Sequence, residues 1–146
     1  MADLIIEMLT VGPFMANCYL VGCPETLEAV VIDPGGDARA ILAALATRGL
    51  KARYVVNTHG HVDHIAANAQ VKAATGAEIL IHEADAAMLT NPARSLALLS
   101  AVTVRQSPAD RTLAEGESVK VGSVALEVVH TPGHTPGGIC LKAPGL

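Results

Sequence analysis

Short runs of apolar residues recur along the chain, separated by turns and by segments with helical periodicity. Runs of four to eight apolar residues bounded by Gly, Pro or Asn are typical of buried strands. They predict strands in the first part of the chain at residues 4–11, 18–21, 29–33, 53–57 and 78–82.

The segments between these strands predict helices. The first follows a Pro-Gly-Gly turn, begins with Asp37 as its cap and ends at Gly49. A second is predicted over residues 64–75, closed by Gly76, and a short third one over residues 87–89. The apolar face of the first helix is formed by Ile41, Leu42 and Leu45.

The last third of the chain returns to strands. A Gly-Ser turn between residues 119–121 and 124–129 predicts a hairpin, and residues 138–142 predict a final strand. Residues 91–111 show no clear pattern. Strands that alternate with helices predict one layered α/β domain over residues 1–146.

Composition and charge narrow the class of protein. Hydrophobic residues make up 51% of the 146 positions and charged residues 16%, which is too apolar for a disordered chain. The net charge is −4, and the ten Lys and Arg residues are scattered. The aromatic residues are only Phe14, Tyr19 and Tyr54. No basic patch or stacking platform for nucleic acid is therefore expected.

No membrane span and no secretory signal are predicted. The longest uncharged stretch, residues 8–24, is interrupted by Gly and Pro, and a span needs about 20 mostly apolar residues. Asp3 and Glu7 stand where a signal peptide has basic residues. The three cysteines are odd in number and lack Cys-x-x-Cys spacing, so a reducing cytoplasm is the expected compartment.

The segment after the strand at residues 53–57 reads Thr-His-Gly-His-Val-Asp-His. In an extended segment, His59 and His61 project to one side and can both reach one metal ion. Asp63 and His64 follow at the start of the helix and can face a second ion. Imidazole and carboxylate donors suit zinc, iron or manganese, and the segment predicts a metal site.

A second His-containing loop follows the strand at residues 124–129. His134 lies at its apex, between two Pro-Gly pairs, and would complete three imidazoles with His59 and His61. Three protein ligands and a water form the open arrangement of catalytic zinc. His130, at the end of the strand, is predicted to be structural or to support a ligand.

Other reactive residues receive ordinary structural interpretations. His82 is expected at a strand end, and Asp85 is expected to support the start of the following helix. Cysteines without a basic neighbour favour small core positions over nucleophilic ones, and this interpretation covers Cys18, Cys23 and Cys140.

Together these motifs resemble the metallo-β-lactamase fold superfamily, and within it the glyoxalase II-type hydrolases. The resemblance rests on the His-x-His-x-Asp-His segment, on the Thr-Pro-Gly-His-Thr-Pro-Gly-Gly loop, and on the Asn-Cys-Tyr-Leu-Val and Val-Ile-Asp-Pro-Gly-Gly-Asp segments near the start. It covers essentially the whole chain, and it implies an αββα sandwich with the site at one edge between two sheets.

The resemblance also implies roles for individual residues. The first ion would be bound by His59, His61 and His134, and the second by Asp63 and His64, with Asp63 also catalytic. Asp33 matches an aspartate that braces the metal loops by hydrogen bonding. The implied cofactor is Zn²⁺, two ions in a full-length protein, with iron or manganese as alternatives.

The family pattern continues beyond the last strand with an aspartate that bridges both metals and with a later histidine. This chain ends at Leu146 before either of them. The chain is therefore expected to be the N-terminal part of an incomplete sandwich. An uncovered apolar sheet face would then favour self-association.

Three functional hypotheses follow. The leading one is a metal-dependent hydrolase of S-acylglutathione-type thioesters, a small-molecule substrate, in which hydroxide held at the metal attacks the carbonyl. The second is an iron-dependent persulfide dioxygenase of the same superfamily, which would bind iron through two His and one carboxylate. The third is a non-catalytic fragment.

Overall fold

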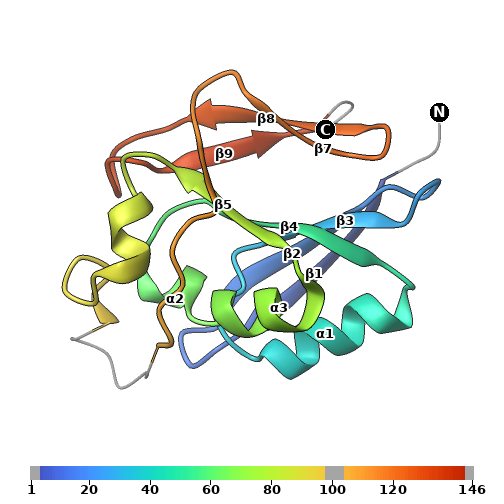
Figure 1. Cartoon of the computed structure of the whole chain (residues 1–146), viewed down its shortest axis with the longest axis horizontal. Coiled ribbons are helices and arrows are strands. Elements are labelled where there is room, and N and C mark those ends of the chain that lie inside the picture. Colours follow the sequence, from blue (N-terminus) through green and yellow to red (C-terminus); the bar gives the residue numbers. More distant parts are fainter. Residues whose placement is uncertain (1–3, 98–103, 144–146) are drawn as a thin grey trace.

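Two β-sheets lie face to face, and helices cover the outer face of the larger sheet (Figure 1). The computed structural model describes residues 4–97 and 104–143. In this part of the chain, no helix covers the outer face of the smaller sheet (Figure 1). The layered α/β architecture predicted from the sequence is confirmed, in the order helices, sheet, sheet.

The larger sheet has six strands that lie side by side in chain order. The first three are antiparallel neighbours, and the third to sixth run parallel to one another. The carboxyl ends of the parallel strands therefore meet at one edge of the sheet. The strands are β1 (Ile5–Val11), β2 (Ala16–Gly22), β3 (Glu28–Ile32), β4 (Lys51–Asn57), β5 (Glu78–His82) and β6 (Arg111–Leu113).

The smaller sheet is antiparallel and consists of β7 (Ser118–Val121), β8 (Val124–His130) and β9 (Ile139–Lys142). The predicted hairpin and final strand are therefore confirmed. The short strand β6 was not predicted; it has only three residues and begins where the stretch without a clear pattern ends. Residues 98–103 of that stretch fall outside the described residues.

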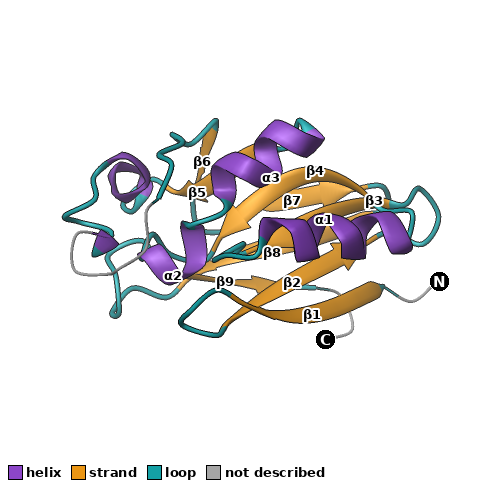
Figure 2. Cartoon of the chain, turned by 90° about the horizontal axis from the view of Figure 1, so that it is seen from below, coloured by secondary structure: helices purple, strands orange, loops and turns teal. Residues whose placement is uncertain are grey.

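The helices are α1 (Ala38–Thr47), α2 (Val62–Ile65), α3 (Asn68–Thr75) and the 3₁₀ helix η1 (Ala86–Thr90). Figure 2 shows α1 and α3 lying across the larger sheet. The prediction of a single helix over residues 64–75 is wrong, because the helical conformation is interrupted between α2 and α3. The N–H of Ala67 donates to the carbonyl of Pro34, 2.8 Å away, instead of continuing the helical ladder.

Asp37 is the N-cap residue of α1, as predicted, but it does not cap the helix through its side chain. Asp37 precedes the helix in a left-handed conformation with φ of 50° and makes no side-chain cap hydrogen bond. Its carboxylate accepts the N–H of Gly12 instead, at 2.9 Å. The residue thus joins the turn between β1 and β2 to the start of α1.

Successive side chains of the central strands point to opposite faces of the larger sheet, and this divides the core into two parts. On β3, Val31 packs toward the helices with Ile41 of α1, whereas Val30 faces the smaller sheet with Leu126 of β8. All four side chains are buried. The larger sheet is therefore apolar on both faces, and this rigid layer supports the loops at its edge.

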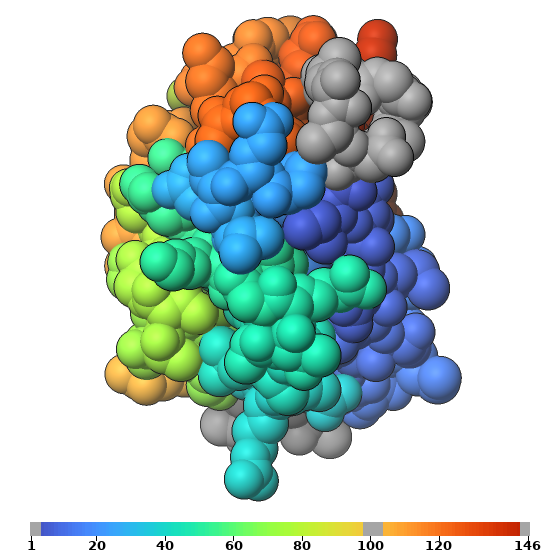
Figure 3. Space-filling view, turned by 90° about the vertical axis from the view of Figure 1, so that its right-hand side faces the viewer, coloured from blue at the N-terminus to red at the C-terminus, as the bar shows by residue number. Residues whose placement is uncertain are grey.

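The β7–β8 turn fixes the smaller sheet on the larger one at the far end of the molecule. The N–H of Gly122 donates to the carboxylate of Glu28, 3.1 Å away. The hydroxyl of Ser123 donates to the carboxylate of Glu25, 3.4 Å away. Figure 3 shows these two turns in contact, the β7–β8 turn in orange and the β2–β3 turn in light blue.

The two sheets leave an open apolar groove of about 500 Å³ between β1–β2 and β9. Ile6 and Tyr19 line it from the larger sheet and remain 43% and 36% exposed, while Leu141 lines it from β9. None of the helices in the described part of the chain has the length and apolar character needed to cross a bilayer.

Candidate metal centre

Polar residues of the candidate site gather at the carboxyl ends of the parallel strands. Asp33 follows β3, Thr58 and His59 follow β4, and Asp85 follows β5. The β8–β9 loop joins them, because the N–H of Ile139 donates to the carbonyl of Thr58 at 2.8 Å. Both sheets therefore contribute to one site, as the resemblance implies.

Three imidazoles form the first group of candidate ligands. One nitrogen each from His59, His61 and His134 lies within 4.8 Å of the other two. Nδ1 of His61 and Nε2 of His134 are 3.0 Å apart. The structure thus brings together the three residues expected to bind the first ion.

The hydrogen bonds of Thr58 orient His59. The Thr58 hydroxyl donates its proton to Oδ2 of Asp33, 2.6 Å away, because a carboxylate only accepts. The hydroxyl oxygen lies 3.2 Å from Nδ1 of His59 and must therefore accept a hydrogen bond from the protonated Nδ1. Nε2 of His59 is then free to bind a metal ion.

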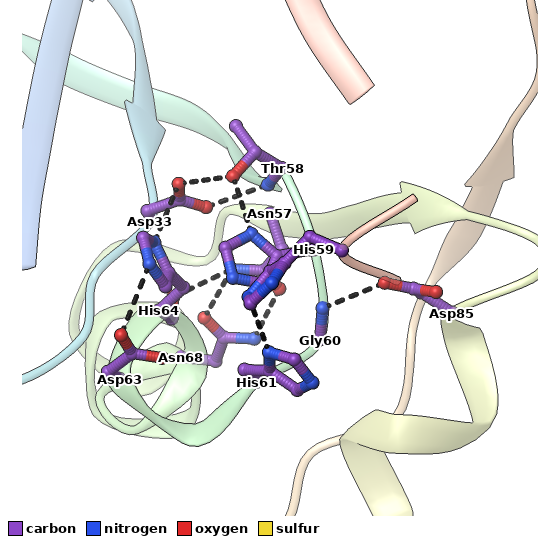
Figure 4. A network of polar contacts seen from close by, with 11 residues as sticks. Asp33, Asn57, Thr58, His59, Gly60, His61, Asp63, His64, Asn68 and Asp85 are labelled. Atoms are coloured by element: carbon purple, nitrogen blue, oxygen red, sulfur yellow. Dashed lines mark hydrogen bonds and ion pairs between the residues drawn. The ribbon is translucent and has the colours of Figure 1, made fainter. Parts of the chain in front are cut away.

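His59, Asp63 and His64 form the second candidate group. Nδ1 of His64 lies 3.0 Å from Oδ2 of Asp33, and its Nε2 lies 3.4 Å from Oδ2 of Asp63 (Figure 4). With its Nδ1 proton bound to Asp33, His64 presents Nε2 toward Asp63. The bracing role expected for Asp33 is confirmed, since its carboxylate contacts both Thr58 and His64.

Burial and neighbouring charges set the protonation of the imidazoles. Burial, and then the charge of His64, lower the pKa of His59 to about 4. Burial and the charge of His134 also lower the pKa of His61, against the charges of Asp63 and Asp85. Burial acts in the same direction on His64, but the hydrogen bond to Asp33 and the carboxylate charges raise its pKa overall. His59 and His61 are therefore neutral at pH 7, the form that binds metal.

A buried amide pair fixes the segment that carries Asp63 and His64. The side chains of Asn57 and Asn68 exchange two hydrogen bonds, at 2.7 and 3.1 Å. The amide of Asn57 also donates to the carbonyl of His64 at 3.1 Å. These contacts hold α2 and the start of α3 against the end of β4, and they explain why the predicted helix is broken there.

Asp85 was missed as a site residue. The expectation that it supports the start of η1 is wrong, because it makes no side-chain cap hydrogen bond there. Its side chain is buried and accepts the N–H of Gly60, the hydroxyl of Thr135 and the N–H of Gly137. These partners lie 25, 50 and 52 positions away in the sequence, so local patterns carried no signal for them.

The two remaining histidines lie beside the β8–β9 loop. The rings of His82 and His130 stack with centroids 4.1 Å apart and an angle of 13°. Nε2 of His130 donates to the carbonyl of Pro136 at 2.9 Å. The predicted supporting role of His130 and the strand-end position of His82 agree with these contacts.

The cysteines divide into buried and exposed residues. Cys18 and Cys23 are buried, and burial together with the charge of Asp33 raises the pKa of Cys18 to about 12. Hydrogen bonds from Thr26 and Ser123 lower the pKa of Cys23 to about 6, but its side chain has no exposed surface to present to a substrate. The expected core position of Cys140 is wrong, because β9 turns its thiol outward.

Comparisons with known proteins agree with this geometry. The chain is 37% identical over 142 residues to a hydroxyacylglutathione hydrolase from Polaromonas, covering 96% of this chain and 47% of that protein. The crystal structure of the B3 metallo-β-lactamase BLEG-1 superposes with a TM-score of 0.86 at 31% identity, over 95% of this chain and 67% of that one. The crystal structure of TTHA1623 in a di-iron-bound form superposes with a TM-score of 0.79 at 31% identity, over 94% of this chain and 67% of that one. Residues 11–146 match the sequence pattern of the metallo-beta-lactamase superfamily, and the chain belongs to that family.

Proposed function

We propose that this chain carries the metal centre of a hydrolase that cleaves thioesters of the S-acylglutathione type. The observation that carries the proposal is the convergence of three imidazoles, from His59, His61 and His134, beside Asp63 and His64. The similarity to the Polaromonas hydroxyacylglutathione hydrolase supports the substrate class. Because the chain spans 47% of that relative, the activity is proposed for the whole protein.

The donor set favours zinc. Neutral imidazoles and a carboxylate are ligands that Zn²⁺ prefers. In the whole protein, His59, His61 and His134 would hold one ion, and Asp63 and His64 would contribute to a second. A divalent ion bound there lowers the pKa of a bound water to about 7 and polarises the carbonyl of a substrate. The cytoplasm is the proposed compartment, since the three cysteines are free.

Asp63 is the proposed catalytic residue. Its side chain is 36% exposed, and its Oδ2 faces the His64 ring. The carboxylate accepts a proton from water as the water oxygen forms a bond to the thioester carbon. The carbonyl electron pair moves to oxygen and returns as the C–S bond breaks, and the sulfur leaves as a thiolate. Because a thiolate is a good leaving group, no strong general acid is required.

The test compares zinc-loaded protein with its His134→Ala variant on S-lactoylglutathione and on a β-lactam. We expect the unchanged protein to hydrolyse the thioester and not the β-lactam. We expect the rate on the thioester to fall at least 100-fold in His134→Ala, because the variant lacks one metal ligand. The deciding experiment uses the full-length protein: if it binds zinc yet leaves the thioester intact, the substrate class is wrong.

An iron-dependent persulfide dioxygenase is the alternative enzyme. The similarity to TTHA1623, whose structure is of a di-iron-bound form, supports iron as the metal of this site. Metal analysis and oxygen uptake separate the two proposals. Iron in the purified protein with oxygen consumption on a persulfide supports the dioxygenase, whereas zinc without oxygen uptake supports the hydrolase.

A non-catalytic fragment remains the third proposal, and the open groove between the sheets supports it. Ile6 and Tyr19 line this groove and keep more than a third of their surface in solvent. A monomeric chain that unfolds cooperatively and hydrolyses thioesters would rule out this proposal.

A further inference from the structure

Asp85 connects the two loops that carry the first group of imidazoles. Its Oδ2 accepts the N–H of Gly60 at 3.0 Å and the hydroxyl of Thr135 at 2.6 Å, while Oδ1 accepts the N–H of Gly137 at 2.6 Å. Gly60 lies between His59 and His61, and Thr135 follows His134. One carboxylate thus contacts a sequence neighbour of each of the three imidazoles: Gly60, next to His59 and His61, and Thr135, next to His134.

This carboxylate is buried without a cation. Its side chain has 0% exposure, and none of the ion pairs found between described residues includes it. Burying a charge is costly unless hydrogen bonds or an opposite charge compensate for it. Three neutral donors supply the hydrogen bonds, and a cation among the nearby imidazoles would supply the opposite charge.

The glycines on both loops allow the close approach to Asp85 and η1. A Cβ added at Gly137 would lie 2.7 Å from the nitrogen and 2.8 Å from Oδ1 of Asp85. A Cβ added at Gly60 would lie 2.6 Å from the Cβ of Met88. The absence of side chains at these two positions is what lets the loops meet at the carboxylate.

Asp85 lies on the opposite side of the ligand loop from Asp33. Figure 4 shows Asp33 beside Thr58 and His64, and Asp85 beside Gly60. Asp33 therefore orients Thr58 and His64 within one ligand segment, whereas Asp85 binds groups of two different loops and sets the distance between them.

We propose that Asp85 is a positioning residue that sets the metal affinity of the His59–His61–His134 group by holding the two loops at a fixed separation. The inference rests on the metal site of the proposed function, but it does not depend on the substrate. Its test is metal binding, so a failure on thioesters leaves it standing.

The first test is Asp85→Asn, which keeps the shape of the side chain. Whichever oxygen becomes an NH₂ group, that group faces a backbone N–H, either that of Gly137 or that of Gly60. One of the two loops therefore loses its contact. Groups that hold metal ligands in place typically contribute 10–100-fold to affinity. We expect Co²⁺ and Zn²⁺ affinity, measured by chelator competition, to fall by about 10–100-fold, with a changed Co²⁺ absorption spectrum.

The matched control is Asp110→Asn. Asp110 also accepts a backbone N–H, from Ile79 at 2.8 Å, but Ile79 lies at the end of β5 away from the site. This variant should bind both metals as the unchanged protein does. Thr135→Val is the milder second variant, because it removes one of the three donors and leaves the carboxylate in place. It should give a smaller loss of affinity than Asp85→Asn.

Circular dichroism and thermal unfolding of the metal-free variants separate positioning from general support. Lower thermal stability with unchanged metal affinity and an unchanged Co²⁺ spectrum in the folded protein would overturn the proposal. A loss of affinity as large in Asp110→Asn as in Asp85→Asn would also overturn it. If Asp85→Asn does not fold, unchanged affinity in Thr135→Val has the same meaning.

Discussion

Nδ1 of His61 lies 3.0 Å from Nε2 of His134, although 73 positions separate the two residues in the sequence. His61 belongs to the loop after β4 in the larger sheet, and His134 to the loop between β8 and β9 in the smaller one. Two nitrogens at this distance share one proton, and a metal ion can replace that proton. The first site therefore forms only where the two sheets meet.

Removal of the His134 imidazole, the ligand from the smaller sheet, should abolish tight metal binding at the first site. In His134→Ala, two imidazoles remain of the three. We expect the protein to stay folded, since His134 is exposed, and to lose Zn²⁺ during dialysis against a weak chelator. Metal content after dialysis measures this effect. Lys120→Ala is the control, because Lys120 is exposed on β7 of the same sheet and is outside both candidate groups, and metal retention equal in the two variants would contradict the assignment.

Asp33 should control the second site through the tautomer of His64. Asp33→Asn preserves the left-handed backbone, with φ of 56°, which Asn tolerates. If its oxygen accepts the Thr58 N–H, its NH₂ group faces Nδ1 of His64, which must then accept a proton. The His64 proton moves to Nε2, so this nitrogen can no longer bind an ion.

Nitrogen NMR of the imidazole rings, with metal stoichiometry, checks that prediction. We expect Asp33→Asn to invert the His64 tautomer and to lose binding at the Asp63–His64 pair. Asp37→Asn is the matched control, because Asp37 also has a positive φ, of 50°, and also accepts a backbone N–H. A normal His64 tautomer in Asp33→Asn would count against the bracing mechanism.

The stability of the metal-free protein should rise with pH between about 4 and 6.5. The pKa of His59 is lowered from 6.5 to about 4 in the folded chain. Between these values the unfolded chain binds a proton that the folded chain does not, so the free energy of unfolding increases with pH. The contribution of one such group is at most about 1.4 kcal/mol per pH unit, and it ends above pH 6.5.

Urea unfolding of the metal-free protein across this range measures the slope. In His59→Gln the group that titrates is gone, so we expect a smaller slope than in the unchanged protein. Identical slopes in the two proteins would mean that His59 keeps its ordinary pKa in the folded state.

A side chain at position 35 should disturb the segment that carries Asp63. A Cβ added at Gly35 would lie 1.8 Å from the backbone oxygen of Asp63, so the turn after β3 or α2 must move. Overpacking of this kind lowers the free energy of unfolding by about 1–3 kcal/mol. We expect the loss in Gly35→Ala to lie at the upper end of this range, and we expect the variant to bind metal more weakly at the second site.

Gly76→Ala separates this effect from ordinary loss of a glycine. Gly76 has φ of 76°, and a Cβ there would meet nothing within 4 Å. The left-handed backbone alone costs about 1–2 kcal/mol, and metal binding should stay unchanged. Chemical unfolding and metal titration of both variants test the difference, and an equal effect on metal binding would show that the close approach to Asp63 is unimportant.

The candidate ligands could be predicted because their signal is local. His59, His61, Asp63 and His64 fall within six positions, directly after a buried strand, and any fold that continues this strand brings them together. His134 was found because its loop has its own pattern of Pro and Gly. The strands at residues 29–33, 53–57 and 78–82 were equally visible in their apolar runs.

Contacts between distant segments could not be predicted. Asp85 reads as the start of a helix, and only the fold brings Thr135 and Gly137 to it. The break between α2 and α3 depends on Asn57, which pairs with Asn68 from another element. In both examples helix propensity and local capping were overruled by hydrogen bonds of buried groups, which must find partners wherever the fold supplies them.

The groove between β1–β2 and β9 should make this chain bind hydrophobic dyes and self-associate. Ile6 and Tyr19 form an apolar surface there, and β9 is the last strand of the smaller sheet. Exposed apolar patches beside an open strand edge promote pairing with a second copy. We expect the sedimentation coefficient to rise with protein concentration, together with strong fluorescence of an added anilinonaphthalene dye.

Ile6→Lys should reduce both signals by placing a charge in the groove. Phe14→Lys is the matched control, because Phe14 is 51% exposed, belongs to the β1–β2 turn and does not line the groove. Both substitutions add one positive charge, so they change the net charge of −4 equally. If Phe14→Lys suppresses self-association as strongly as Ile6→Lys, the groove is not the surface that causes it.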